Sequence, residues 1–249
     1  MLLNLHMLNK KYSLDIKKLA HIGAHKGQEV DEYLKIFPTV EICLFEPQVE
    51  LFTQLEDKYD KLDNFALYNF ALGSSTNISS MYRADNEGQS SSFYKPKEHL
   101  IEHPEIKFTE NSEVFEIKAL DELGIMNIDF LNIDTQGYEL EVLKGSKDAL
   151  GRDVKYIMLE INKKELYDSC PLVKDIDDYL DQYNFTRVAT QYWNDTYSWG
   201  DAFYIKKDLI SFKQNISATV KNQLLDITYI YRTRTLVRKV LKKLRRFFN

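Results

Sequence analysis

The chain has 249 residues, of which 44% are hydrophobic, and its 14 Phe and 16 Tyr allow it to bury a sizeable core. This composition excludes an intrinsically disordered chain, and nine Gly and five Pro exclude a collagen-like or low-complexity one. The net charge is −5, yet residues 220–249 carry nine basic side chains and one acidic one. The acidic remainder argues against nucleic-acid binding, because phosphate contacts need clustered positive charge.

The two ends of the chain and the cysteines bear on location. The first residues lack a basic start and their apolar stretch is broken by Asn4 and His6, so they do not resemble a signal peptide. Cys43 and Cys170 show no metal-ligand spacing and are too few to staple a chain of this size. We therefore expect a cytoplasmic protein. The basic C-terminal segment would allow this protein to associate with a membrane surface.

Short apolar runs alternate with helical patterns over residues 18–207, after a helical segment within 1–17. The apolar runs fall at 19–22, 42–45, 65–72, 114–117, 128–133, 156–161, 185–190 and 202–205. Helical patterns fall at 28–36, from 49 onward, at 138–147 and at 173–183, and residues 78–82 alternate as in a hairpin or edge strand. This alternation predicts one α/β domain with a doubly wound, seven-stranded, mostly parallel sheet.

Two segments lie outside that alternation. Residues 84–113 are polar and predict a long excursion, which would be a lid or binding loop, or else a mobile surface loop. Residues 208–249 form a basic extension in which a helix from about Arg234 would place apolar residues on one stripe. Such a helix would lie on an anionic membrane, or pack on the acidic body or on a second subunit.

In a doubly wound sheet, ligands bind at the carboxyl ends of the strands. The first strand runs into a turn with Gly23 and Gly27, whose spacing differs from the G-x-G-x-x-G of dinucleotide sites, so the two glycines could serve the turn alone. The second strand ends at Glu46, which is placed to accept both ribose hydroxyls of an adenosine cofactor, or else to start the next helix before Pro47. These residues indicate an adenosine-containing cofactor without separating NAD from S-adenosylmethionine.

Further strand ends resemble a known family, the FkbM-type class I methyltransferases, which use S-adenosylmethionine. The resemblance covers roughly residues 18–205. It rests on the glycine turn, Phe45-Glu46-Pro47, the Asn-x-Ala-Leu-Gly segment at 69–73, the Leu-Asp-Glu-Leu at 120–123, the segment from Ile133 to Glu139, the Val-Leu-Lys-Gly at 142–145, and Glu160. It implies a Rossmann-like fold, S-adenosylmethionine as cofactor, and methylation of a hydroxyl on a glycan or another natural product.

The resemblance also implies roles for individual residues. The methionine part of the cofactor would contact Gly23, Ala24, His25 and Gly27, and the ribose would contact Glu46 beside Pro47. The adenine would lie near Asn69 and Ala71, with Asp134 beside the methyl group. The expected acceptor contacts are Ser90, Ser91, Ser92, Gln136 and Glu139.

Removing a proton from the acceptor hydroxyl needs a base, and the candidates are Asp134, Glu160 and His25, with His99 and His103 as alternatives. An Asp is a weak base unless burial raises its pKa, and Asp134 could instead cap the following helix. Two carboxylates do not specify a Mg²⁺ site, so no metal is assigned.

The chain departs from the family pattern at three positions, where His21 replaces an Asp, His25 an Asn and Gln136 an acid. Two alternatives therefore stay open. One is an NAD-dependent oxidoreductase, which the missing third glycine of the dinucleotide fingerprint disfavours. The other is a methyltransferase-fold binding module without turnover, which the changes at His21 and Gln136 would permit.

Overall fold

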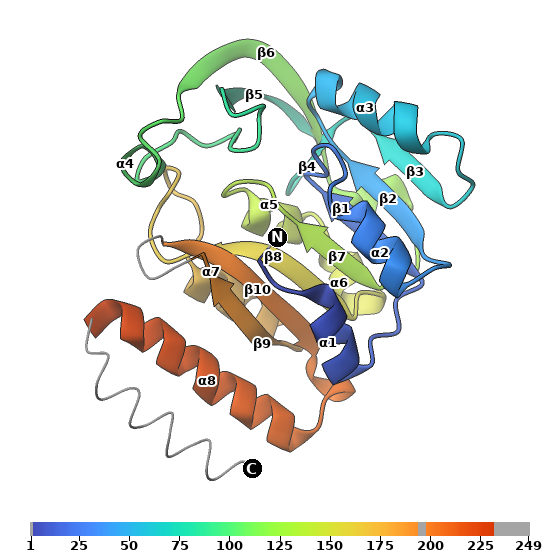
Figure 1. Ribbon diagram of the computed structural model, residues 1–249, viewed down its shortest axis with the longest axis vertical. Helices are drawn as coiled ribbons and strands as arrows, with labels where there is room; N and C mark the ends of the chain where they lie inside the picture. The colour runs from blue at the N-terminus through green and yellow to red at the C-terminus, as the bar shows by residue number, and fades with distance from the viewer. Residues whose placement is uncertain (1, 194–197, 232–249) are drawn as a thin grey trace.

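A computed structural model describes residues 2–193 and 198–231, and its centre is a seven-stranded sheet (Figure 1). The strand order is β3-β2-β1-β7-β8-β10-β9. The bounds are β1 Lys18–Ile22, β2 Glu41–Phe45, β3 Phe65–Tyr68, β7 Phe130–Ile133, β8 Tyr156–Asn162, β9 Phe185–Tyr192 and β10 Trp199–Lys206. Six strands run in the same direction, and β10 is antiparallel to both of its neighbours, β8 and β9. The predicted doubly wound, mostly parallel sheet is confirmed.

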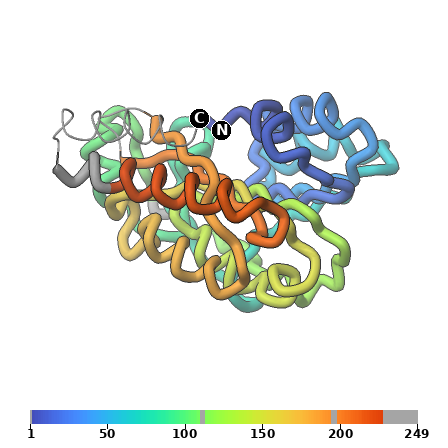
Figure 2. The backbone as a smooth tube through the Cα atoms, turned by 90° about the horizontal axis from the view of Figure 1, so that it is seen from below, coloured from blue at the N-terminus to red at the C-terminus, as the bar shows by residue number. Residues whose placement is uncertain are grey.

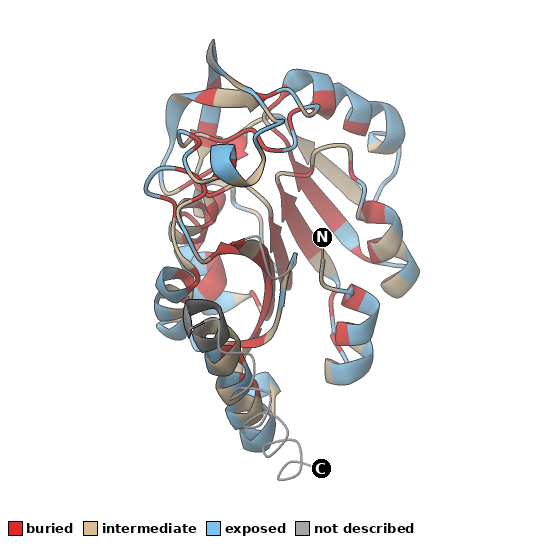
Figure 3. Cartoon of the chain, turned by 60° about the vertical axis from the view of Figure 1, so that its left-hand side comes forward, coloured by how far each residue is buried: buried red, intermediate tan, exposed pale blue. Residues whose placement is uncertain are grey.

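Helices cover both faces of this sheet, as Figures 1 and 2 show. On one face lie α1 Leu5–Tyr12, α2 Val30–Ile36 and α3 Val49–Tyr59. On the other lie α5 Glu139–Lys144, α6 Lys147–Arg152 and α7 Val173–Asp181. Successive strand residues alternate between the two cores: Leu19 and Ile42 face the first group of helices, whereas Ala20 and Cys43 face the second. Both faces of the central strands are thus buried (Figure 3), which explains their continuous apolar runs.

The third apolar run, 65–72, does not form one strand as its pattern suggested. It divides into β3 in the main sheet and β4 Ala71–Leu72 in a separate three-stranded sheet with β5 Asn77–Ala84 and β6 Phe108–Lys118. Asn69 sits at the division, and its side-chain amide donates to the backbone carbonyls of Glu46 and Pro47 at 2.9 and 3.2 Å. This side chain ties the chain to the end of β2 as it leaves the main sheet.

The excursion at 84–113 is more ordered than its polar composition suggested. It contains α4 His99–Glu102 and the first part of β6. Tyr82 and Ser92 form a backbone bridge with N–O distances of 2.8 and 3.1 Å, and Pro96 bridges to Tyr167. Backbone pairing with other parts of the chain therefore holds a segment that has few apolar residues of its own.

The C-terminal extension contains η2 Lys207–Leu209 and α8 Phe212–Tyr231, and α8 packs along β9. The helix expected from Arg234 lies outside the described residues, so its membrane contact stays a prediction. No helix in the described ranges is both long and apolar enough to cross a bilayer.

A buried guanidinium joins α7, β9 and α8. The Arg187 side chain is 5% exposed and pairs with Asp177 of α7 at 2.8 Å and Asp226 of α8 at 2.6 Å. We expect Arg187→Ala to lower the free energy of unfolding by about 3 kcal/mol, because it leaves two partly buried carboxylates without their cation. Urea denaturation measures this loss.

The matched control for Arg187 is Lys174→Ala, which removes an exposed pair with Asp178 on α7 and should change stability by less than about 0.5 kcal/mol. If Arg187→Ala and Lys174→Ala had the same denaturation midpoint, the ion pairs of Arg187 would not stabilise the packing of α8 on β9.

Candidate active site

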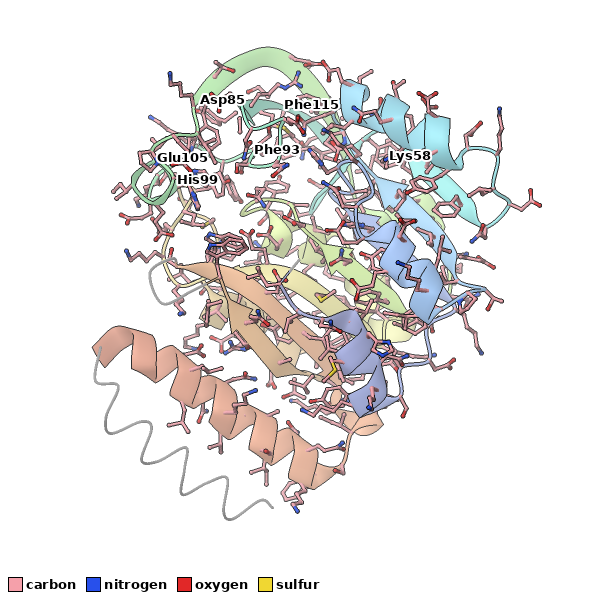
Figure 4. All side chains as sticks on the ribbon, viewed as in Figure 1. Lys58, Asp85, Phe93, His99, Glu105 and Phe115 are labelled. Carbon is pink, nitrogen blue, oxygen red and sulfur yellow. The ribbon has the colours of Figure 1, made fainter. Side chains whose placement is uncertain are left out.

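A cavity of about 460 Å³ opens at the carboxyl ends of β1, β2, β7 and β8. Among the residues selected from the sequence, those that line it are His21, Gly23, His25, Glu46, Pro47, Ala71, Ser90, Ser91, His99, His103, Asp134, Gln136 and Glu160. Phe93 and His99 line it from the excursion, and both lie between the small sheet and the main sheet in Figure 4. The topology thus brings residues from six separate parts of the chain to one cavity.

The glycine turn after β1 is shaped by contact with the end of β7. Gly23 has φ +78°, and a Cβ placed there would lie 1.9 Å from the backbone oxygen of Asp134. The backbone N–H groups of Gly23 and Ala24 both donate to the carbonyl of Phe45 at 3.0 Å. Only glycine fits this crossing of β1, β2 and β7.

Glu46 is the best-defined polar group of the cavity wall. Its side chain is 3% exposed, and its two oxygens accept hydrogen bonds from the backbone N–H groups of His25 and Gln48, both at 2.9 Å. Burial raises its pKa above the ordinary value, against these two hydrogen bonds. The carboxylate is therefore fixed in orientation, and its remaining lone pairs can accept hydroxyl groups.

A second acidic group lies at the ends of β7 and β8. Gln136 donates from Nε2 to Oδ1 of Asp134 at 2.7 Å and to Oε2 of Glu160 at 3.2 Å. Its own Oε1 accepts from the Tyr167 hydroxyl at 3.0 Å. The amide that replaces the family's usual acid thus joins two carboxyl groups that would otherwise repel each other. Among the described residues, no three of His, Cys, Asp and Glu are grouped so that they could hold a metal ion.

The carboxyl groups here have raised pKa values. Burial and the neighbouring charge of Asp134 raise the pKa of Glu160 well above its usual range, and burial raises that of Asp134. Asp201, on the strand paired with β8, also lines the cavity and has a pKa raised by burial. Raised values bring a carboxylate closer to the basicity that proton abstraction near neutral pH requires.

The excursion closes over both parts of the cavity. The His25 ring contacts the backbone oxygen of Glu87 at 3.0 Å, and Gln48 donates to the backbone oxygen of Gly88 at 3.4 Å. Ser92 donates to the backbone oxygen of Gln136 at 2.7 Å. One loop therefore touches the glycine turn and the acidic group together.

Several predicted residues lie beside the cavity rather than in its lining: Ala24, Gly27, Asn69, Ser92 and Glu139. Glu139 is buried beneath the turn after β7, where its Oε1 accepts from the backbone N–H groups of Thr135 and Gly137 at 3.0 and 3.1 Å. Burial raises its pKa to about 7. Its geometry suits bracing of the turn rather than direct contact with an acceptor.

His21, which replaces the family's Asp, is a neutral group of the cavity wall. It is 2% exposed, and burial lowers its pKa. Its Nδ1 lies 3.4 Å from the Tyr33 hydroxyl, which accepts from the Asn132 side chain at 2.7 Å. At this position the chain has exchanged a carboxylate for an uncharged ring.

Sequence reasoning missed four lining residues that matter for the site: Gln48, Trp193, Trp199 and Asp201. Gln48 follows Glu46 closely enough to have been included with the end of the second strand. The other three come from the hairpin of β9 and β10, and no local pattern indicated that this hairpin reaches the cavity.

The sheet order, the glycine turn after β1 and the acidic residue after β2 define a class I S-adenosylmethionine-dependent methyltransferase. A family model described as the methyltransferase FkbM domain matches residues 21–187. The chain belongs to the FkbM methyltransferase family, and S-adenosylmethionine is its cofactor. This membership sets aside the NAD-dependent alternative.

Two individual proteins illustrate the likeness. The chain is 27% identical over 169 residues to a protein named 2-O-methyltransferase NoeI, from Sinorhizobium fredii strain NBRC 101917 / NGR234, covering 64% of this chain and 69% of that one. The crystal structure of Methyltransferase FkbM from Methylobacillus flagellatus KT aligns with a TM-score of 0.51 at 12% identity. That alignment covers 76% of this chain and 43% of the other, so this chain spans less than half of that protein.

Proposed function

We propose that this protein transfers a methyl group from S-adenosylmethionine to a hydroxyl group of a glycan or another hydroxylated natural product. The observation that carries the proposal is the pair of carboxyl groups, Asp134 and Glu160, joined by Gln136 in the same cavity as the glycine turn and Glu46. The name of the NoeI relative describes an O-methyltransferase, which supports a hydroxyl acceptor.

The residues of the cavity fit the cofactor. Oε1 of Glu160 is buried and has no hydrogen-bond partner among the described residues, so this acidic wall has capacity for a cationic ligand. Asp134 and Asp201 add two further carboxyl groups. Bound there, S-adenosylmethionine supplies an electrophilic methyl group on a positively charged sulfur. We assign the ribose hydroxyls to Glu46 beside Pro47, the methionine part to the turn from Gly23 to Gly27, and the adenine to the wall at Ala71.

The carboxyl pair would handle the acceptor proton. Asp134, held by Gln136, takes the proton from the acceptor hydroxyl as that oxygen bonds to the methyl carbon and the carbon–sulfur bond breaks, which leaves an ether, a neutral thioether and a protonated carboxyl group. Glu160, on the next strand, is the second candidate for this step. Before the transfer, Ser90, Ser91 and the rest of the excursion would exclude water and align the hydroxyl oxygen of the acceptor with the methyl group.

His25 fits a positioning role better than the base role that the sequence allowed. Its Nε2 contacts the Glu87 carbonyl at 3.0 Å and its Nδ1 contacts Gln28 at 2.9 Å, so both ring nitrogens are engaged. The ring would hold the excursion against the cofactor turn. Asn69 would support the site through the backbone that follows β2, and Glu139 through the backbone of the turn after β7.

The test is methyl transfer itself. Purified protein is incubated with S-adenosylmethionine carrying a deuterated methyl group and a panel of glycans and phenolic natural products, and the products are analysed by mass spectrometry. We expect a labelled methyl ether on a glycan hydroxyl. Cofactor binding measured by calorimetry without transfer to any acceptor would favour the binding module without turnover.

Cofactor affinity should also depend on pH. The carboxyl groups of Asp134, Glu160 and Asp201 have raised pKa values, so they become protonated as the pH falls through those values and lose their attraction for a cation. We expect the affinity for S-adenosylmethionine to fall several-fold from mildly alkaline to mildly acidic pH.

Calorimetric titration across that range measures this dependence, and S-adenosylhomocysteine is the matched ligand because it lacks the charge on sulfur. Its affinity should change less with pH. If the affinities of the two ligands changed equally with pH, the carboxyl groups would not lie close to the positively charged sulfur of the bound cofactor.

A further inference from the structure

Two indole rings form one wall of the cavity. Trp193 and Trp199 come from the ends of β9 and β10, and their rings stack with centroids 5.4 Å apart and planes 16° apart. Both line the cavity, and Trp193 is 53% exposed. A half-exposed stack of large aromatic rings beside a cavity is a surface suited to a flat ligand.

The strand register places this wall beside the acidic group. In the antiparallel pair of β8 and β10, Asp201 lies opposite Glu160 and Trp199 lies opposite Asn162. Residues two apart on a strand share a face of the sheet, so Trp199 lies on the same face as Asp201 and Glu160. A ligand on the indoles would therefore extend toward the carboxyl groups of β7 and β8.

A polar group completes the wall. His99 is 4% exposed, lines the cavity, and its Nδ1 has no hydrogen-bond partner among the described residues. Its ring packs against Tyr167 and Phe108, with centroids 5.5 and 5.1 Å away, and burial lowers its pKa to about 4. The imidazole is therefore neutral near pH 7 and can both donate and accept a hydrogen bond.

The helix that carries His99 is fastened to the tryptophan segment. Oε2 of Glu102 accepts from the backbone N–H of Ser198 at 3.0 Å, one residue before Trp199. The backbone N–H of His99 donates to the carbonyl of Leu166 at 3.1 Å, and Trp199 packs against the cluster of Leu166, Tyr167 and Cys170. The imidazole and the indoles thus lie on adjoining parts of one cavity wall.

We propose that Trp193 and Trp199 bind the C–H face of a pyranose ring of the acceptor while His99 hydrogen-bonds one of that ring's hydroxyls. This assignment rests on the proposed methyl transfer to a hydroxyl group. A pyranose has an apolar face that suits the negative face of indole and a rim of hydroxyls that suits His99 and Glu160. A purely aromatic acceptor would cover the indoles and leave the buried Nδ1 of His99 without a partner, at a cost in binding.

Tryptophan fluorescence reads this surface directly, because the chain contains only two Trp residues and both belong to it. The full chain is titrated with a panel of methyl pyranosides, with S-adenosylhomocysteine present and absent. Glycerol is the control, since it has hydroxyls and no ring face. We expect a saturable change with at least one pyranoside and none with glycerol.

Variants assign the effect to individual side chains. Trp199→Leu and His99→Phe should each weaken pyranoside binding, and raise the acceptor KM, by about tenfold, whereas the calorimetric affinity for S-adenosylmethionine stays unchanged. The unchanged cofactor affinity also shows that the variants fold. Phe212→Leu, at an exposed position of α8, is the matched aromatic control and should change neither pyranoside binding nor the acceptor KM.

Three results would overturn the assignment. One is that no pyranoside changes the fluorescence although the cofactor binds. Another is that phenols change it and pyranosides do not, which would make the wall a site for an aromatic acceptor. The third is that Trp199→Leu keeps the acceptor KM. Failure of the proposed function is a separate result, because it appears as absent cofactor binding or absent transfer in assays that do not use the fluorescence of the indoles.

Discussion

Replacing Glu46 with alanine is expected to weaken the binding of S-adenosylmethionine by about a hundredfold. The carboxylate is buried at the end of β2, and the substitution removes the acceptor proposed for the ribose hydroxyls. It also leaves the backbone N–H groups of His25 and Gln48 without their partner, which loosens the turn on both sides of the cofactor. Isothermal titration with S-adenosylmethionine measures the loss, and a parallel titration with NAD measures whether the cavity distinguishes the two cofactors.

The matched control for Glu46 stands at the other end of the same strand. Glu41 begins β2, and its exposed carboxylate pairs with Lys18 at 2.9 Å, far along the strand from the cavity. Glu41→Gln should bind the cofactor as the unchanged chain does. If Glu46→Ala kept the affinity of that control, the ribose would have to bind elsewhere.

Asp134→Asn should lower kcat by about a hundredfold to ten-thousandfold while cofactor affinity changes only a few-fold. The amide has nearly the same shape and its oxygen can still accept the hydrogen bond from Gln136, so the geometry at the end of β7 is kept. What is lost is the capacity to take a proton from the acceptor. Steady-state rates of methyl transfer, with calorimetric affinities for S-adenosylmethionine, separate these two effects.

Glu160→Gln identifies which carboxyl group takes the proton. A small effect of Glu160→Gln beside a large effect of Asp134→Asn would assign the base to Asp134, and the reverse would assign it to Glu160. Asp148→Asn, at an exposed position of α6, controls for the loss of one negative charge. Full turnover by Asp134→Asn would exclude it as the base.

The central strands and their ends were predictable because their pattern is physical and local. Strands buried on both faces must be apolar, and a parallel sheet gathers its strand ends at one edge, so Gly23, Glu46, Asp134 and Glu160 could be predicted to meet. The division of residues 65–72 between two sheets could not be predicted, because both parts are apolar and only the contact of Asn69 with the end of β2 separates them.

Two other features could not be predicted from the sequence, for a different reason: the orientation of the turn residues, and the extension of the hairpin of β9 and β10 to the cavity. Glu139 and Ser92 are close in the chain to cavity residues, yet hydrogen bonds with the turn after β7 place them beside the cavity. Trp199 and Asp201 reach the cavity because β10 lies antiparallel between β8 and β9. That insertion depends on pairing between distant segments, for which a single sequence contains no local pattern.

The helix that Arg187 fastens also changes what the outermost strand can do. β9 ends the order of the main sheet, and a strand in that position offers unpaired backbone groups on which other chains can add as further strands. Asn222 of α8 donates to the backbone carbonyl of Arg187 at 2.5 Å and accepts from the hydroxyl of Thr190 at 3.0 Å. The helix thus occupies one backbone acceptor of the edge strand and covers this part of β9, which leaves less of the edge open to a further strand. None of the residues that line the cavity comes from the described part of α8.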